Sequence, residues 1–88
     1  EVPAKTTRKA GTSFPMEYGE TVTIKASYSP FSANVDFGLI DSNGRFYYFT
    51  ETDGSVDKTI KISSRGNYTF AVRNNSSYAI SVSGYVNY

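Results

Sequence analysis

Apolar and polar residues alternate along most of the chain, and turn-forming residues interrupt the alternation at regular intervals. Segment 20–28 is the clearest example, because Val22, Ile24, Ala26 and Tyr28 share one parity and polar residues lie between them. A period of two is the spacing of side chains on one face of a β-strand. Clusters of Asp, Asn, Gly, Ser and Thr end the runs at 41–44, 52–54, 63–66 and 74–77. Short strands at this spacing predict an antiparallel sandwich or barrel.

The parity of each run predicts which side chains form the core. Beyond the first run, the predicted inward residues are Val35, Phe37, Leu39, Val56, Ile60, Ile62, Tyr68, Phe70, Val72, Tyr78, Ile80, Val82 and Val86. No long window shows the three-and-four recurrence of a helix, so helix content should be close to nil. Two face-to-face sheets would let every apolar face meet another. We therefore expect an all-β, antiparallel β-sandwich of about seven short strands.

The dipeptide Asn43-Gly44 predicts a hairpin, because both residues tolerate positive φ. With a two-residue or four-residue loop, Phe46 and Tyr48 share the core face with Phe37 and Leu39. Tyr47 and Phe49 then fall on the opposite face. A three-residue loop would reverse this partition, since a one-residue slip moves every side chain to the other side of the sheet.

The chain is expected to form one folded unit. Residues 1–11 carry Pro3 and the cations Lys5, Arg8 and Lys9, and are interpreted as a flexible or edge N-terminal arm. Residues 12–88 are interpreted as a single β-sandwich domain. Segment 12–16 is a possible first strand, which Pro15 would confine to a sheet edge.

Composition narrows the function classes. The net charge of +1 gives no field that would hold nucleic acid or an anionic membrane surface. The absence of Cys and His rules out disulfides, the usual zinc ligand sets and Ser-His-Asp triads. We therefore expect the protein to bind no cofactor and to have no enzymatic activity. No apolar run approaches the ~20 residues that span a bilayer. The chain opens at Glu1, like a processed product, and its richness in Ser, Thr, Tyr and Asn favours a secreted or cell-surface bacterial protein.

Aromatic residues make up 16% of the chain, and the run 46–49 must place them on both faces of one strand. Tyr47 and Phe49, with Tyr85, are the candidate binding residues: an exposed aromatic surface could stack on a sugar ring or anchor a protein partner. The alternative is that they pack beneath the N-terminal segment or a long loop.

The aspartate and glutamate carboxylates suggest two other roles, Ca²⁺ binding and glycoside hydrolysis. Asp36, Asp41, Asp53 and Asp57 could supply oxygen ligands for Ca²⁺, but turn formation explains the loop at Asp41 better, because a closing Glu is missing. Asp36 with Glu51 is a conceivable pair for glycoside hydrolysis, although a sandwich of this size rarely forms the cleft required.

Two stretches, Asn34-Val35-Asp36-Phe37-Gly38-Leu39-Ile40-Asp41-Ser42-Asn43-Gly44 and Gly66-Asn67-Tyr68-Thr69-Phe70-Ala71-Val72-Arg73-Asn74-Asn75-Ser76-Ser77, carry a family resemblance. They resemble the core pattern of GOLD-type domains and of bacterial pre-peptidase C-terminal domains, over roughly residues 20–88. The resemblance implies a jelly-roll-like sandwich that serves as a non-catalytic recognition or accessory module outside the cytoplasm. The cysteine pair usual in GOLD modules that carry secretory cargo is absent here.

These observations favour a secreted or cell-surface recognition module that binds a protein or a carbohydrate. One alternative is a small antibacterial or toxin-like effector that uses the cationic arm. Another is a structural tile of a surface assembly, in which an exposed edge strand is shared between subunits.

Overall fold

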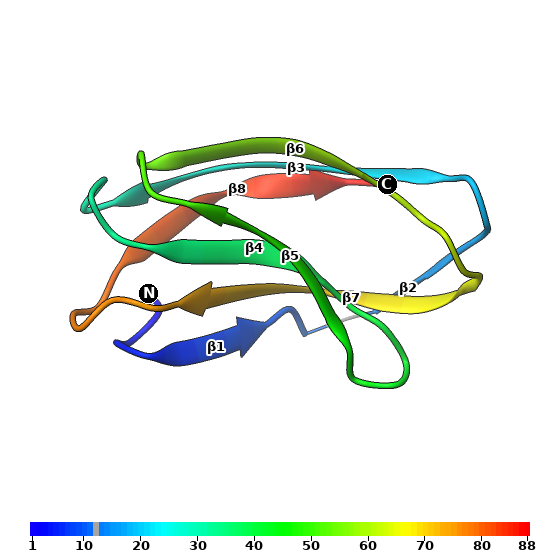
Figure 1. The fold of residues 1–88 in the computed structure, drawn as a ribbon, viewed down its shortest axis with the longest axis horizontal. Coiled ribbons are helices and arrows are strands. Elements are labelled where there is room, and N and C mark those ends of the chain that lie inside the picture. Colours follow the sequence, from blue (N-terminus) through cyan, green and yellow to red (C-terminus); the bar gives the residue numbers. More distant parts are fainter. Residues whose placement is uncertain (12) are drawn as a thin grey trace.

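The alternating segments form eight β-strands in the computed structural model, which describes residues 1–11 and 13–88 (Figure 1). The strands are β1 (Thr6–Lys9), β2 (Phe14–Met16), β3 (Thr21–Ser29), β4 (Val35–Ile40), β5 (Phe46–Glu51), β6 (Ser55–Lys61), β7 (Gly66–Asn74) and β8 (Ser81–Asn87). No helix occurs in these described ranges. The predicted all-β class is confirmed, with eight strands rather than about seven.

The strands pair antiparallel in two sheets. One sheet has the order β1-β7-β4-β5, with β2 also paired to β7, and the other has the order β6-β3-β8. Figure 1 shows β6, β3 and β8 as one layer above the other strands. Among the described strands, every connection from β2 to β8 passes between the sheets except the β4–β5 hairpin. Such repeated crossing is typical of a jelly-roll-like sandwich.

The core lies between the sheets and is made mostly by predicted inward residues, which Val2, Ala33, Phe14 and Met16 join. The core has two halves: Ile24 of β3 belongs to one with Val35 and Phe37 of β4, and Val22 belongs to the other with Leu39, and all five are fully buried. Phe70, Ile60 and Val86 are partly buried and pack against both halves of the core. The prediction was wrong for Tyr78, which precedes β8 and is exposed. Period-two burial therefore holds along most of the interior.

Strand β4 is buried on both faces along almost its whole length. Asp36 and Gly38 point away from the core, yet both are buried. An added Cβ at Gly38 would collide with the backbone of Tyr47 and Tyr48, so glycine permits the close approach of β5.

The N-terminal arm lies along the edge of the five-stranded sheet. Residues Thr6–Lys9 pair with β7 as strand β1, and Val2 is buried in the core, where its backbone exchanges two hydrogen bonds with Ile80. The predicted strand 12–16 is observed as Phe14–Met16, with Pro15 at the sheet edge, and Thr12 lies outside the described residues.

Asn74 holds the arm against the rest of the molecule. Its side chain is fully buried, and its Nδ2 donates to the carbonyl oxygens of Val2, Pro3 and Tyr78. Its Oδ1 accepts a hydrogen bond from the backbone N–H of Ser76. One amide therefore satisfies backbone groups from two segments that are distant in sequence.

Candidate binding surface

The turn between β4 and β5 decides which aromatic side chains face outward. Ile40 pairs with Phe46, so residues 41–45 form a five-residue loop. Asp41 organises it: Oδ1 accepts hydrogen bonds from the backbone N–H groups of Asn43 and Arg45, both at 2.9 Å, and Gly44 takes a φ of 86°. The hydrogen bonds from Arg45 and Asn43 lower the pKa of the Asp41 carboxyl. The Asp41 carboxylate thus serves turn formation.

The predicted partition of aromatic residues on β5 was wrong. Because the loop has an odd number of residues, Leu39 pairs with Tyr47 and Phe37 pairs with Phe49. Directly paired residues lie on the same face of a sheet, so Tyr47 and Phe49 are on the inward side and Phe46 and Tyr48 are on the outer side.

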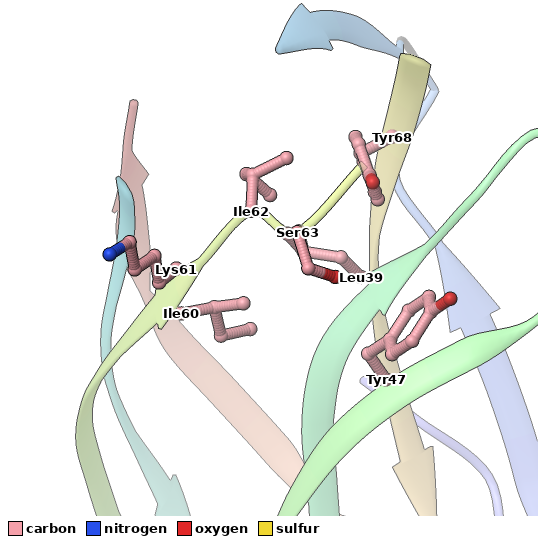
Figure 2. Close-up of a pocket in the computed structure, with 7 residues that line it drawn as sticks. All are labelled: Leu39, Tyr47, Ile60, Lys61, Ile62, Ser63 and Tyr68. Atoms are coloured by element: carbon pink, nitrogen blue, oxygen red, sulfur yellow. The ribbon is translucent and has the colours of Figure 1, made fainter. Parts of the chain in front are cut away.

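Tyr47 and Phe49 close the side of the sandwich where β5 approaches β6. Figure 2 shows Tyr47 beside Leu39, Ile60, Ile62 and Tyr68 around a hollow of about 30 Å³. The Tyr47 hydroxyl donates a hydrogen bond to Asp41 Oδ2 at 3.2 Å. The centre of the Phe49 ring lies 5.9 Å from Lys58 Nζ of β6. A hollow of this size holds about one water molecule and is too small for an organic ligand.

Tyr85 lies away from this region. It belongs to β8, pairs with Lys25 of β3 and is 60% exposed on the outer side of the three-stranded sheet. The three predicted site residues therefore do not form one surface: Tyr47 and Phe49 lie on the inner side of one sheet, and Tyr85 on the outer side of the other.

The outer face of the five-stranded sheet carries a different group of side chains, which sequence reasoning did not bring together. At its centre Asp36 of β4 is only 2% exposed. Its Oδ1 accepts a hydrogen bond from Thr50 Oγ1 at 2.6 Å, and its Oδ2 accepts from Arg73 Nε at 2.8 Å and from Asn75 Nδ2 at 2.9 Å. A second guanidinium nitrogen of Arg73 lies 2.6 Å from Oδ2. The buried carboxylate is thus paired and fully hydrogen-bonded.

Electrostatics keep this pair charged. Burial raises the pKa of Asp36, but hydrogen bonds from Asn75, Thr50 and Arg73, with the charge of Arg73, outweigh burial, so the pKa lies below its ordinary value. The hydrogen bond to Asp36 in turn raises the pKa of Arg73.

The Arg73 guanidinium packs against two neighbouring aromatic rings. Its Cζ lies 4.6 Å from the centre of the Tyr48 ring and 5.1 Å from the centre of the Phe46 ring. The two rings are 5.0 Å apart and inclined by 34°. We call Phe46, Tyr48 and Arg73 the outer-face aromatic cluster. Because Tyr48 is 48% exposed and Arg73 is anchored by a buried carboxylate, the cluster presents a fixed aromatic surface to solvent.

Asp36 and Glu51 do not come together as a carboxylate pair. Asp36 is fully engaged as a hydrogen-bond acceptor on the outer face, whereas Glu51 pairs with Val35 and belongs to the inner side. The two carboxyl groups that sequence reasoning considered as a pair are therefore directed to opposite faces. Across residues 1–11 and 13–88, no three carboxylates come together as a metal site would require.

The signal that could have revealed the cluster is parity. The alternation of apolar and polar residues places Asp36 and Arg73 on the polar faces of their strands. Their pairing across 37 positions follows only from the register between β4 and β7. Tyr48 joins them only once the loop length is known to be odd.

No protein-family model matches the chain, and no curated protein matches it. The resemblance to GOLD-type and pre-peptidase C-terminal domains therefore remains a prediction. The described residues include no helix long and apolar enough to cross a membrane.

Proposed function

We propose that this protein is a non-catalytic recognition module, secreted or displayed on a cell surface, that binds its partner through the outer-face aromatic cluster. The observation that carries the proposal is the packing of the Arg73 guanidinium, held by the buried Asp36, against the neighbouring rings of Tyr48 and Phe46. A surface that is already ordered loses little conformational entropy on binding.

Of the two partner classes expected from the sequence, a glycan fits this chemistry better than a protein. The Asp36 carboxylate neutralises the charge of Arg73, so the cluster offers aromatic faces without net charge. Such faces can stack against the C–H groups of a neutral sugar ring. Thr50 and Asn75 border the same face. They donate to Asp36, and their side-chain oxygens can accept hydrogen bonds from sugar hydroxyls.

Glycan-array binding of the wild-type chain, Tyr48→Ala and Tyr85→Ala tests the proposal. Tyr85 is the matched control, because it is an exposed tyrosine on the other sheet. We expect the wild type and Tyr85→Ala to bind the same neutral glycans, and Tyr48→Ala to lose tenfold or more in affinity, about 1.4 kcal/mol. Melting temperatures should stay within a few degrees of wild type.

Two results would contradict the proposal. One is a wild-type chain that binds no glycan on the array. The other is a Tyr48→Ala variant that binds as tightly as the wild type, which would place the contact elsewhere.

A further inference from the structure

Strand β8 has an open edge. It is the outermost strand of the three-stranded sheet and pairs with β3 on one side. On the other side, within residues 1–11 and 13–88, its only neighbour in the sheet is Val2, which pairs with Ile80 just before the strand begins. Unpaired backbone groups along such an edge form a template for another strand.

The Val2–Ile80 pair shows which backbone groups of β8 face outward. Ile80 donates its N–H to Val2 and accepts a hydrogen bond from the Val2 N–H. Backbone groups alternate in direction along an antiparallel strand. The N–H and C=O groups of Val82, Gly84 and Val86 therefore point to the same open side as those of Ile80.

The chemistry of β8 differs from that of the other edge strands. Its residues Ser81–Asn87 include no charged side chain and no proline. The other edges carry such residues: Arg8 and Lys9 in β1, Pro15 in β2, Glu51 in β5, and Asp57, Lys58 and Lys61 in β6. Charges and prolines on edges prevent strand-to-strand association, and β8 lacks both.

A groove with an apolar floor runs beside this edge. Two hollows of about 300 and 350 Å³ share Phe70 and Val82, and their walls also include Val86 and Val72. Glu1, Arg8 and Lys9 of the N-terminal arm line the far side of the larger hollow. Val82 and Val86 are only partly buried, so the groove leaves apolar surface uncovered next to the free backbone groups.

We propose that β8 pairs antiparallel with β8 of a second copy of this chain, about a two-fold axis at Gly84. This register opposes Gly84 to Gly84 and Val82 to Val86, and makes about six backbone hydrogen bonds. A second copy suits this edge because β8 carries no charge, so its pairing with itself about a two-fold axis brings no like charges together. The added strand occupies the part of the edge beyond the Val2–Ile80 pair, from Val82 to Val86.

The register predicts which side chains meet on the outer side. Ser83 of one copy faces Tyr85 of the other, and both residues are exposed in the single chain. Lysine at both positions places like charges directly opposite each other at two places in the dimer. Glutamate at both positions in a second variant restores opposite charges when the two variants are mixed.

Sedimentation and amide exchange test the proposal together. Between about 10 μM and 1 mM, we expect the wild-type chain to shift from monomer to dimer, a range that suits a small interface. The amides of Val82, Gly84 and Val86 should become protected as dimer forms. Those of Ser83 and Tyr85 should be protected throughout, because β3 already pairs with them.

Variants separate this mode of pairing from other association. Ser83→Lys/Tyr85→Lys should weaken dimerisation by about tenfold or more, and mixing it with Ser83→Glu/Tyr85→Glu should restore dimer. The matched control, Ser55→Lys/Thr59→Lys, adds two lysines at exposed positions of β6, the opposite edge, and should dimerise like the wild type. Any of three results would overturn the proposal. The wild-type chain stays monomeric at 1 mM, the lysine variant dimerises as the wild type does, or the amides of Val82, Gly84 and Val86 gain no protection from exchange.

Discussion

Asp36 is the residue around which the outer face of the five-stranded sheet is organised. Its carboxylate is buried, yet three side chains donate to it, so burial carries no unsatisfied charge. The sequence placed Asp36 on the polar side of its strand, which is confirmed by the register. Its burial could not be predicted, because the donors Thr50, Arg73 and Asn75 lie 14 to 39 positions away.

Replacing Asp36 should therefore lower stability in a pH-dependent way. At pH 7 we expect Asp36→Asn to reduce the free energy of unfolding by about 1–3 kcal/mol, because Arg73 loses its anionic partner. The pKa of Asp36 is lowered in the folded state, so its stabilising effect is present above the ordinary pKa and is lost as the pH falls through the folded value. The difference between wild type and variant should shrink below about pH 4.

Urea denaturation at pH 7 and at pH 3 measures this difference. Asp57→Asn is the matched control, because Asp57 is an exposed aspartate on β6, and its effect should stay within about 0.5 kcal/mol. An Asp36→Asn variant as stable as the wild type at pH 7 would show that the Asp36–Arg73 pair does not hold the outer face.

At the scale of elements, the β4–β5 turn shows what a local sequence pattern can and cannot predict. Asn43-Gly44 correctly indicates a hairpin, and Gly44 has the positive φ that the dipeptide suggests. The loop length was wrong, because Asp41 accepts hydrogen bonds from Asn43 and Arg45 and holds a wider, five-residue turn. One extra residue was enough to exchange the two faces of β5 and to move the candidate site from Tyr47 and Phe49 to Tyr48.

The N-terminal arm is the element most dependent on a single side chain. Asn74→Ala removes the amide that donates to Val2, Pro3 and Tyr78. We expect a loss of about 1–3 kcal/mol and faster exchange of the β1 amides, because the carbonyl oxygens of Pro3 and Tyr78 lose this donor and that of Val2 keeps only the N–H of Ile80. Hydrogen exchange followed by mass spectrometry measures the effect.

Asn67→Ala provides the comparison for that experiment, since Asn67 is an exposed asparagine on the same strand. It should leave exchange in β1 unchanged. Equal exchange in the two variants would mean that strand pairing with β7, and not the Asn74 amide, holds the arm in place.

At the scale of the whole molecule, alternation was sufficient to predict two packed antiparallel sheets. It worked for β3, β6 and β7, where Val22, Val56 and Val72 face the core as expected. It could not assign strands to sheets or reveal β1, because the pairing of the arm with β7 joins segments about 65 residues apart. The location of the outer-face aromatic cluster depends on these same long-range registers.

The most direct test of the binding surface is the position of the Tyr47 and Tyr48 rings in solution, measured by nuclear Overhauser effects. We expect contacts between the Tyr48 ring and the Arg73 side chain, and between the Tyr47 ring and the side chains of Leu39 and Ile60. The reverse pattern, with Tyr48 against Leu39 and Tyr47 against Arg73, would contradict the five-residue turn and the outer-face aromatic cluster together.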